Sequence, residues 1–183
     1  PMASRRDAMV AASRMVLEFD RIGREYPDAR ATCGHFNVYP NSRNTIPGQV
    51  MFSGDLRNPD PATLDRMDAD MRAAVRVVAE SSGVDVEVSV HTVIDYVPFN
   101  ETLVGWVREE AIETGLPWRE MVTGAGHDAV NIAQHYPTTM IFIPCKDGIS
   151  HNPTEDALPE HVAAGATVLA NVLLKTANDR GEL

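Results

Sequence analysis

Residues 121–153 read MVTGAGHDAVNIAQHYPTTMIFIPCKDGISHNP, and this stretch decides how the second half of the chain is expected to fold. Its apolar run Met140–Pro144 carries no charge and is bounded by polar residues, which predicts a buried central strand. Loops that leave the ends of such strands are where open α/β sheets bind ligands. We therefore expect a candidate site around His151, which follows the run, and His127, which precedes it.

Helices and strands are predicted to alternate around this stretch. Apolar spacing predicts helices over 100–115, 128–135 and 159–177, and strands over 118–122 and 138–144. The residues of the last helix that are expected to face inward are Val162, Ala166, Leu169, Val172 and Leu173. This alternation predicts part of a sheet covered by helices.

The first half of the chain has a different order of elements. The pattern predicts a helix over 8–24, strands over 31–39 and 49–57, a helix from Asp60-Pro61 to Gly83, and a strand over 84–90. Along the second of these strands, alternate residues are apolar, so one face is expected to be buried. A plait of four antiparallel strands would need one more strand than this half contains.

Composition restricts the classes of function. The 183 residues carry a formal net charge of -10, which argues against a nucleic-acid partner, because phosphate binding needs clustered Lys and Arg. The charge also disfavours anionic membrane surfaces, and no apolar run reaches the length of a membrane span. Two cysteines do not make a disulfide framework, so a cytoplasmic protein is expected.

Arg57 and His151 each allow two interpretations. The guanidinium of Arg57 can hold a substrate carboxylate through two parallel hydrogen bonds, or it can pair with Asp55 on the same strand face. The imidazole of His151 suits a metal ion, but one histidine is no metal site, and a hydrogen-bonded loop histidine is the simpler interpretation. Asn44 lies in a turn, where asparagine is usually a turn residue.

The glycine-rich segment before His127 also allows two interpretations. Gly124, Ala125 and Gly126 at a helix start can expose backbone N–H groups to an anion or oxyanion. Equally, a tight strand-to-helix turn can need glycine for its dihedral angles. Cys145 has no base at fixed geometry, so it is expected to be a small buried thiol rather than a nucleophile.

Several motifs resemble a known family. Residues 124–129, GAGHDA, and 140–152, MIFIPCKDGISHN, are similar to the carboxy-terminal signature of the amidase/carbamoylase branch of the dinuclear-metal aminoacylase and carboxypeptidase superfamily. Residues 41–48, NSRNTIPG, and 55–57, DLR, match the lid domain of the same branch. That branch includes N-carbamoyl-L-amino-acid hydrolases, β-ureidopropionases and allantoate amidohydrolases.

The resemblance implies an α/β (α+β) fold with two domains. Residues 1–97 would be a ferredoxin-like lid and dimerisation domain that lacks its first strand. Residues 98–183 would be the carboxy-terminal segment of an α/β metallohydrolase catalytic domain. The chain would then be the carboxy-terminal part of a longer enzyme that dimerises through the lid. Because the general base would lie upstream, no catalytic residue is expected within the chain, which alone is expected to be inactive.

The resemblance also implies roles for individual residues. Asn44 and Arg57 match lid residues that bind the substrate carboxylate, and the loop Gly124–His127 matches one that lines the substrate pocket. His151 matches the last metal ligand, on one of the two divalent ions of the full enzyme. Zinc, manganese, nickel and cobalt are all suitable, and at most weak binding is expected of this chain alone. The implied reaction is metal-assisted hydrolysis of an N-carbamoyl amino acid or ureido acid. Two alternatives stay open, namely a non-catalytic dimerisation or binding module, and an aminoacylase or peptidase of the same superfamily.

Overall fold

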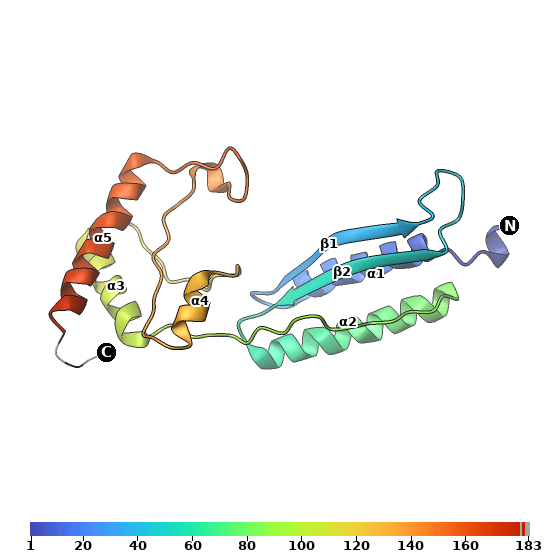
Figure 1. The fold of residues 1–183 in the computed structure, drawn as a ribbon, viewed down its shortest axis with the longest axis horizontal. Helices are drawn as coiled ribbons and strands as arrows, with labels where there is room; N and C mark the ends of the chain where they lie inside the picture. Colours follow the sequence, from blue (N-terminus) through green and yellow to red (C-terminus); the bar gives the residue numbers. More distant parts are fainter. Residues whose placement is uncertain (180, 182–183) are drawn as a thin grey trace. The chain divides into compact units, whose positions relative to one another are not determined.

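The computed structural model describes residues 1–179 and 181, and the chain divides into two compact units, Pro1–Tyr96 and Val97–Leu183 (Figure 1). We call them unit 1 and unit 2. Unit 1 contains η1 (Met2–Ser4), α1 (Ala8–Glu25), β1 (Arg30–Tyr39), β2 (Gln49–Arg57) and α2 (Pro61–Ser82). Unit 2 contains α3 (Glu101–Glu113), α4 (Asp128–Ala133), η2 (Lys146–Gly148) and α5 (Pro159–Ala177). The fold is therefore mixed α/β with a small sheet.

The sheet of unit 1 is an antiparallel hairpin of β1 and β2. Tyr39 pairs with Gln49 near the connecting loop, Arg30 pairs with Arg57 at the other end, and an irregularity interrupts the register between Thr32 and His35. Alternate β2 residues pack on the helices, as the sequence pattern predicts. The opposite face of the hairpin carries polar residues and is largely exposed.

The core of unit 1 lies between the hairpin and the two long helices. Its buried members are Met15, Phe19, Ile22, Ala29, Met67, Met71, Val75 and Ala79, and Phe52 and Leu56 of β2 pack against them. Helix α1 contacts both strands, whereas α2 packs mainly along α1 and touches only β2. Met67, Met71 and Val75 lie at helical spacing along α2 and are buried, so one stripe of this helix faces the core.

Both ends of α2 are fixed by the residues that the sequence predicts. Asp60 is the N-cap, and its carboxylate accepts from the backbone N–H of Thr63 at 3.0 Å. Pro61 occupies the first turn, where a missing N–H costs no helical hydrogen bond. Gly83 ends the helix in the left-handed conformation, with φ at 65°.

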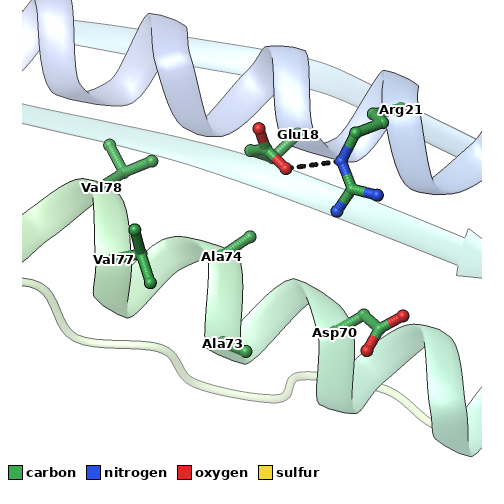
Figure 2. Close-up of a pocket in the computed structure, with 7 residues that line it drawn as sticks. All are labelled: Glu18, Arg21, Asp70, Ala73, Ala74, Val77 and Val78. Atoms are coloured by element: carbon green, nitrogen blue, oxygen red, sulfur yellow. Dashed lines mark hydrogen bonds and ion pairs between the residues drawn. The ribbon is translucent and has the colours of Figure 1, made fainter.

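The strand predicted over 84–90 is wrong for this structure. The segment runs back along α2, but the described residues offer it no ladder partner, and it is not a strand (Figures 1 and 2). Val84 packs against the core of unit 1, whereas Val86, Val88 and Val90 are 40–60% exposed. Alternation specifies which side of a strand is apolar, but the strand itself needs a neighbour to take its backbone hydrogen bonds.

Unit 2 has a smaller core between α3 and α5. Leu103, Trp106, Val168 and Val172 are buried there, and Ile141 packs against them. The predicted inward face of α5 is confirmed at Val172 but wrong at Val162, Ala166, Leu169 and Leu173, which are all exposed. This helix is apolar around most of its circumference, so spacing alone does not select the contact face.

The strands predicted over 118–122 and 138–144 are also wrong. Neither segment forms a ladder among residues 97–179 and 181, although Asn100 N–H donates to Thr138 O at 3.0 Å. The predicted burial of the second segment is only partly met, because Ile141 packs against the core whereas Phe142 is 46% exposed. Within residues 1–179 and 181, no helix has the length and apolar character needed to cross a membrane.

Candidate functional site

Arg57 ends β2 on the hairpin face opposite Leu56 and the core. Its Nε donates to Asp55 Oδ1 at 2.8 Å, and its Nη2 donates to Asp55 Oδ2 at 2.7 Å. Both side chains are about half exposed. The hydrogen bonds from Arg57 lower the pKa of Asp55 from its usual 3.8, and the same contact raises the pKa of Arg57. The pair is therefore ionised, with its guanidinium plane fixed on both carboxylate oxygens.

A second guanidinium lies across the ladder from this pair. Arg30 is the β1 partner of Arg57, so the two side chains share one face of the hairpin. Arg30 Nη1 donates to the carbonyl oxygens of Asp28, at 3.3 Å, and Ala29, at 2.8 Å. Among the side chains of the two strand pairs Thr32–Asp55 and Arg30–Arg57, two are guanidinium groups and one is a carboxylate, an excess of positive charge that suits an anionic ligand.

Asn44 lies far from Arg57 within unit 1. It belongs to the loop that joins β1 to β2, which is held by bonds from Gly48 N–H to Tyr39 O and from Ala8 N–H to Pro47 O. Arg57 is the last residue of β2, at the end of the strand away from this loop. The eight steps along this nine-residue strand span roughly 26 Å at the usual rise per residue. The hairpin therefore does not bring the two predicted carboxylate-binding residues together.

The loop Gly124–His127 leads directly into α4. His127 is the N-cap residue of that helix, and its Nε2 lies 2.8 Å from Thr123 Oγ1, which also accepts from Ala125 N–H at 3.3 Å. The imidazole packs edge-on against the ring of Phe142, with the two ring centroids 5.5 Å apart. Thr123 and Phe142 therefore hold the His127 ring from two sides. The sequence pattern does not single out Thr123 as a contact of His127, although the two residues are only four positions apart.

The structure decides between the two interpretations of this loop only in part. Gly126 does not have a positive φ, so its backbone needs no glycine, and a Cβ built on it meets nothing within 4 Å. The turn interpretation thus fails at this position. However, α4 has only six residues, so its N-terminus alone does not make an anion site.

His151 lies in an exposed loop after η2, and not at the exit of a strand as predicted. Its φ is 56°, a left-handed conformation that is uncommon for a residue with a side chain. Its backbone N–H donates to Glu155 Oε2 at 2.9 Å, and Cys145 Sγ lies 3.9 Å from Glu155 Oε1. Glu155 thus ties the histidine and the cysteine into one loop.

The residues of this chain do not by themselves fit a metal centre. Within residues 1–179 and 181, no three His, Cys, Asp or Glu side chains are grouped so that they could hold an ion. A divalent-metal site in a hydrolase takes about three protein ligands, and here the only candidate from the motifs is His151. At most weak metal binding by the chain alone stays a prediction.

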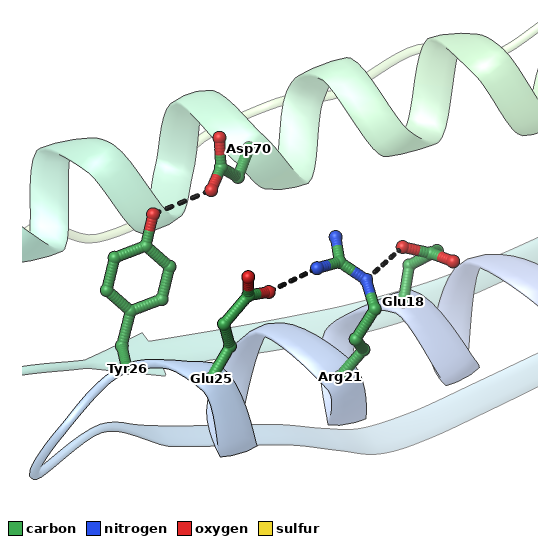
Figure 3. A network of polar contacts seen from close by, with 5 residues as sticks. All are labelled: Glu18, Arg21, Glu25, Tyr26 and Asp70. Atoms are coloured by element: carbon green, nitrogen blue, oxygen red, sulfur yellow. Dashed lines mark hydrogen bonds and ion pairs between the residues drawn. The ribbon is translucent and has the colours of Figure 1, made fainter.

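A groove of about 340 Å³ lies between α1 and α2. Figure 2 shows the residues that line it, Glu18, Arg21, Asp70, Ala73, Ala74, Val77 and Val78. Beside it, Arg21 bonds to Glu18 and Glu25, and Tyr26 Oη donates to Asp70 Oδ2 at 2.6 Å (Figure 3). The Asp70 contact raises the pKa of Tyr26 and joins the two helices. None of the residues singled out from the sequence lines this groove.

Comparisons with known proteins support the resemblance. The model of peptidase family M20/M25/M40 matches residues 9–175. The allantoate amidohydrolase of Bacillus subtilis (strain 168) is 36% identical over 177 residues, which are 96% of this chain and 43% of that protein. An N-carbamoyl-L-amino-acid amidohydrolase of Rhizobium meliloti is 40% identical over 178 residues, which are 97% of this chain and 43% of that protein.

A solved structure agrees with these relatives. The hydantoinase/carbamoylase-family amidase of Burkholderia multivorans superposes with a TM-score of 0.91 at 47% identity, over 98% of this chain and 44% of that one. The resemblance to the amidase/carbamoylase branch is thereby confirmed. The chain spans about 43% of the length of the curated relatives that it matches. On the match over residues 9–175, the chain belongs to peptidase family M20/M25/M40.

Proposed function

We propose that this chain is part of a hydrolase that cleaves a non-peptide C–N bond in a linear amide carrying a carboxylate, such as an N-carbamoyl amino acid or a ureido acid. The observation that carries the proposal is Arg57, an ionised guanidinium fixed in plane on an exposed sheet face, with Arg30 across the ladder. The relatives of this chain act on allantoate and N-carbamoyl-L-amino acids, as their names state, and each of these substrates contains a carboxylate.

Each unit would contribute different residues to substrate binding. Arg57 in unit 1 would bind the substrate carboxylate through paired charged hydrogen bonds. The loop Gly124–His127 in unit 2 would line the pocket for the amide or ureido group, because its histidine is held by Thr123 and Phe142. A group that anchors one end of a flexible substrate lowers the entropy cost of placing the other end for attack.

A centre of two divalent ions belongs to the proposal for a protein of the relatives' length. Of its ligands, this chain would supply His151, whose backbone is held by Glu155. The other ligands and the general base would come from residues outside 1–183, because the described residues contain no group of three. Cys33 and Cys145 are both free thiols, which agrees with the reducing cytoplasm that we propose for the protein.

Unit 1 would be the lid and dimerisation domain. Helix α2 touches β2 but not β1, so part of the helix extends past the edge of the sheet that β2 forms. The segment 84–90 follows α2 and forms no ladder with the described residues. A further strand between β2 and this segment would complete a ferredoxin-like plait and take the backbone bonds of both. Dimerisation through this domain is proposed on the resemblance of unit 1 to the lid domain.

The alternative for the chain by itself is a non-catalytic module, which the lack of a three-ligand group among residues 1–179 and 181 favours. Expressed alone, this chain is expected to release no ammonia from N-carbamoyl-L-alanine and to retain no stoichiometric zinc after dialysis. Turnover with one tightly held zinc per chain would contradict it.

The activity itself is tested in a protein that carries these residues at the length of the relatives. Release of ammonia is measured with N-carbamoyl-L-alanine, N-carbamoyl-β-alanine and allantoate, and release of amino acid with N-acetyl-L-alanine and a dipeptide. The proposal expects turnover in the first group and little in the second. Turnover confined to the second group would replace it with an aminoacylase or peptidase.

A further inference from the structure

Asp55 takes one particular edge of the Arg57 guanidinium. Its two oxygens accept from Nε at 2.8 Å and from Nη2 at 2.7 Å, so the carboxylate lies along the side edge of the planar group. Helical pairs such as Arg24–Asp20 and Arg72–Asp68 join a single guanidinium nitrogen to one carboxylate oxygen. A contact through both oxygens fixes the plane of the guanidinium as well as its distance.

The position of the pair on β2 makes this contact rigid. Residues two apart on a strand project from the same face, and β2 is held to β1 by pairs at both positions, Thr32 with Asp55 and Arg30 with Arg57. Thr32, the neighbour of Asp55 across the ladder, is uncharged, whereas Arg30, the neighbour of Arg57, is another cation. Asp55 is therefore the acidic partner that holds Arg57 beside a like charge.

We propose that Asp55 is a positioning residue for Arg57, which fixes the plane in which the guanidinium meets the substrate carboxylate. The proposal rests on the carboxylate-binding role proposed above for Arg57. Because Asp55 accepts from both Nε and Nη2, the guanidinium cannot turn out of its plane without losing one of these hydrogen bonds. Asp55 itself does not touch the substrate.

The contact is tested first without any activity, in the ¹⁵N-labelled chain of 183 residues. The Nε–H resonance of Arg57, assigned by its disappearance in Arg57→Lys, is expected to be visible at neutral pH because Asp55 shields it from exchange. Asp55→Ala should abolish it. Asp20→Ala, which removes the exposed partner of Arg24, should leave it unchanged. An Arg57 resonance that exchanges equally fast with and without Asp55 overturns the proposal.

The consequence is tested by kinetics on N-carbamoyl-L-alanine in a protein of the relatives' length. Asp55→Ala is expected to raise KM about tenfold with kcat within about threefold, because ground-state and transition-state binding of the remote carboxylate weaken together. Asp55→Glu should bring KM most of the way back to the wild-type value, which a purely structural role does not predict. Asp20→Ala should leave both KM and kcat unchanged.

Two outcomes separate this proposal from the function on which it rests. If Arg57→Ala raises KM and Asp55→Ala does not, Arg57 binds the carboxylate without help from Asp55, and the positioning role is wrong. If neither variant raises KM, the proposed role of Arg57 is wrong, and the positioning role falls with it even where the Nε–H resonance behaves as expected.

Discussion

Asn44 and Arg57 lie at opposite ends of β2, with Asn44 in the loop before the strand and Arg57 at its last residue. The strand alone separates them by roughly 26 Å, which is several times the length of an amino-acid substrate. If both bind one carboxylate, as the family resemblance implies, they must therefore come from different copies of the protein. This geometry gives the proposed dimer a functional reason.

Subunit complementation tests that reason. In a protein of the relatives' length, Asn44→Ala and Arg57→Ala are each expected to lose most activity on N-carbamoyl-L-alanine. When the two variants are unfolded together and refolded as a mixture, half of the dimers would be mixed, and each mixed dimer would contain one intact site. Activity should then rise to about a quarter of the wild-type value. A mixture no more active than its components would show that each copy binds substrate alone.

Gly54 provides a test of the packing of unit 1. A Cβ built on this residue would lie 2.2 Å from Phe19 Cε1, and Phe19 is buried in the core. Gly54→Ala is therefore expected to lower the free energy of unfolding by about 1–3 kcal/mol, as overpacked core sites do. Gly34→Ala is the matched control on β1, because a Cβ there meets nothing within 4 Å. Urea unfolding followed by circular dichroism measures both, and equal costs would contradict the packing.

The Asp55–Arg57 pair predicts a pH dependence of stability. Arg57 lowers the pKa of Asp55 from its usual 3.8, so the pair stabilises the folded chain above that pH. The contribution is lost as the pH falls through the lowered pKa of the folded state. The Asp55 carboxyl carbon is expected to titrate below 3.8 in NMR spectra and to return to the ordinary value in Arg57→Ala. An unchanged midpoint in that variant would contradict the pair.

The core of unit 2 depends on Trp106. This side chain is buried between α3 and α5, and Lys175 Nζ lies 5.7 Å from its ring centroid. Trp106→Ala is expected to cost about 3–5 kcal/mol, as large truncations in a core do. Trp118, the other tryptophan of the chain, is 45% exposed, and its replacement should cost far less. A comparable loss at both positions would argue against the observed core.

Local signals in the sequence predicted α2 and β2 of unit 1 well. The N-cap of α2, its C-terminal glycine and the bounds of β2 are all set by residues within or next to the element, and the structure confirms each. These signals act over one helical turn or one strand pair, so they can be seen without knowledge of the tertiary fold. The left-handed conformation of Gly83 is the clearest example.

Features that depend on distant neighbours were not predicted. The runs 84–90 and 138–144 have strand-like sequences, but in the described structure neither has a strand beside it. The buried face of α5 depends on where α3 packs, and the contact of Thr123 with His127 depends on the path of a loop. The position of Arg30 opposite Arg57 depends on the register across the irregularity in β1. Spacing along the chain contains none of these pairings.

The central claim is that Arg57 recognises the carboxylate of a carbamoyl substrate. Its most direct test is the ratio of kcat/KM for N-carbamoyl-L-alanine to that for its uncharged amide, N-carbamoyl-L-alaninamide, measured in a protein of the relatives' length with and without Arg57→Ala. A paired charged contact is worth about 1.5–3 kcal/mol, so the ratio should fall roughly 10- to 100-fold in the variant. Arg24→Ala, on the surface of α1, should leave the ratio unchanged. A ratio that stays at the wild-type value in Arg57→Ala would contradict the account.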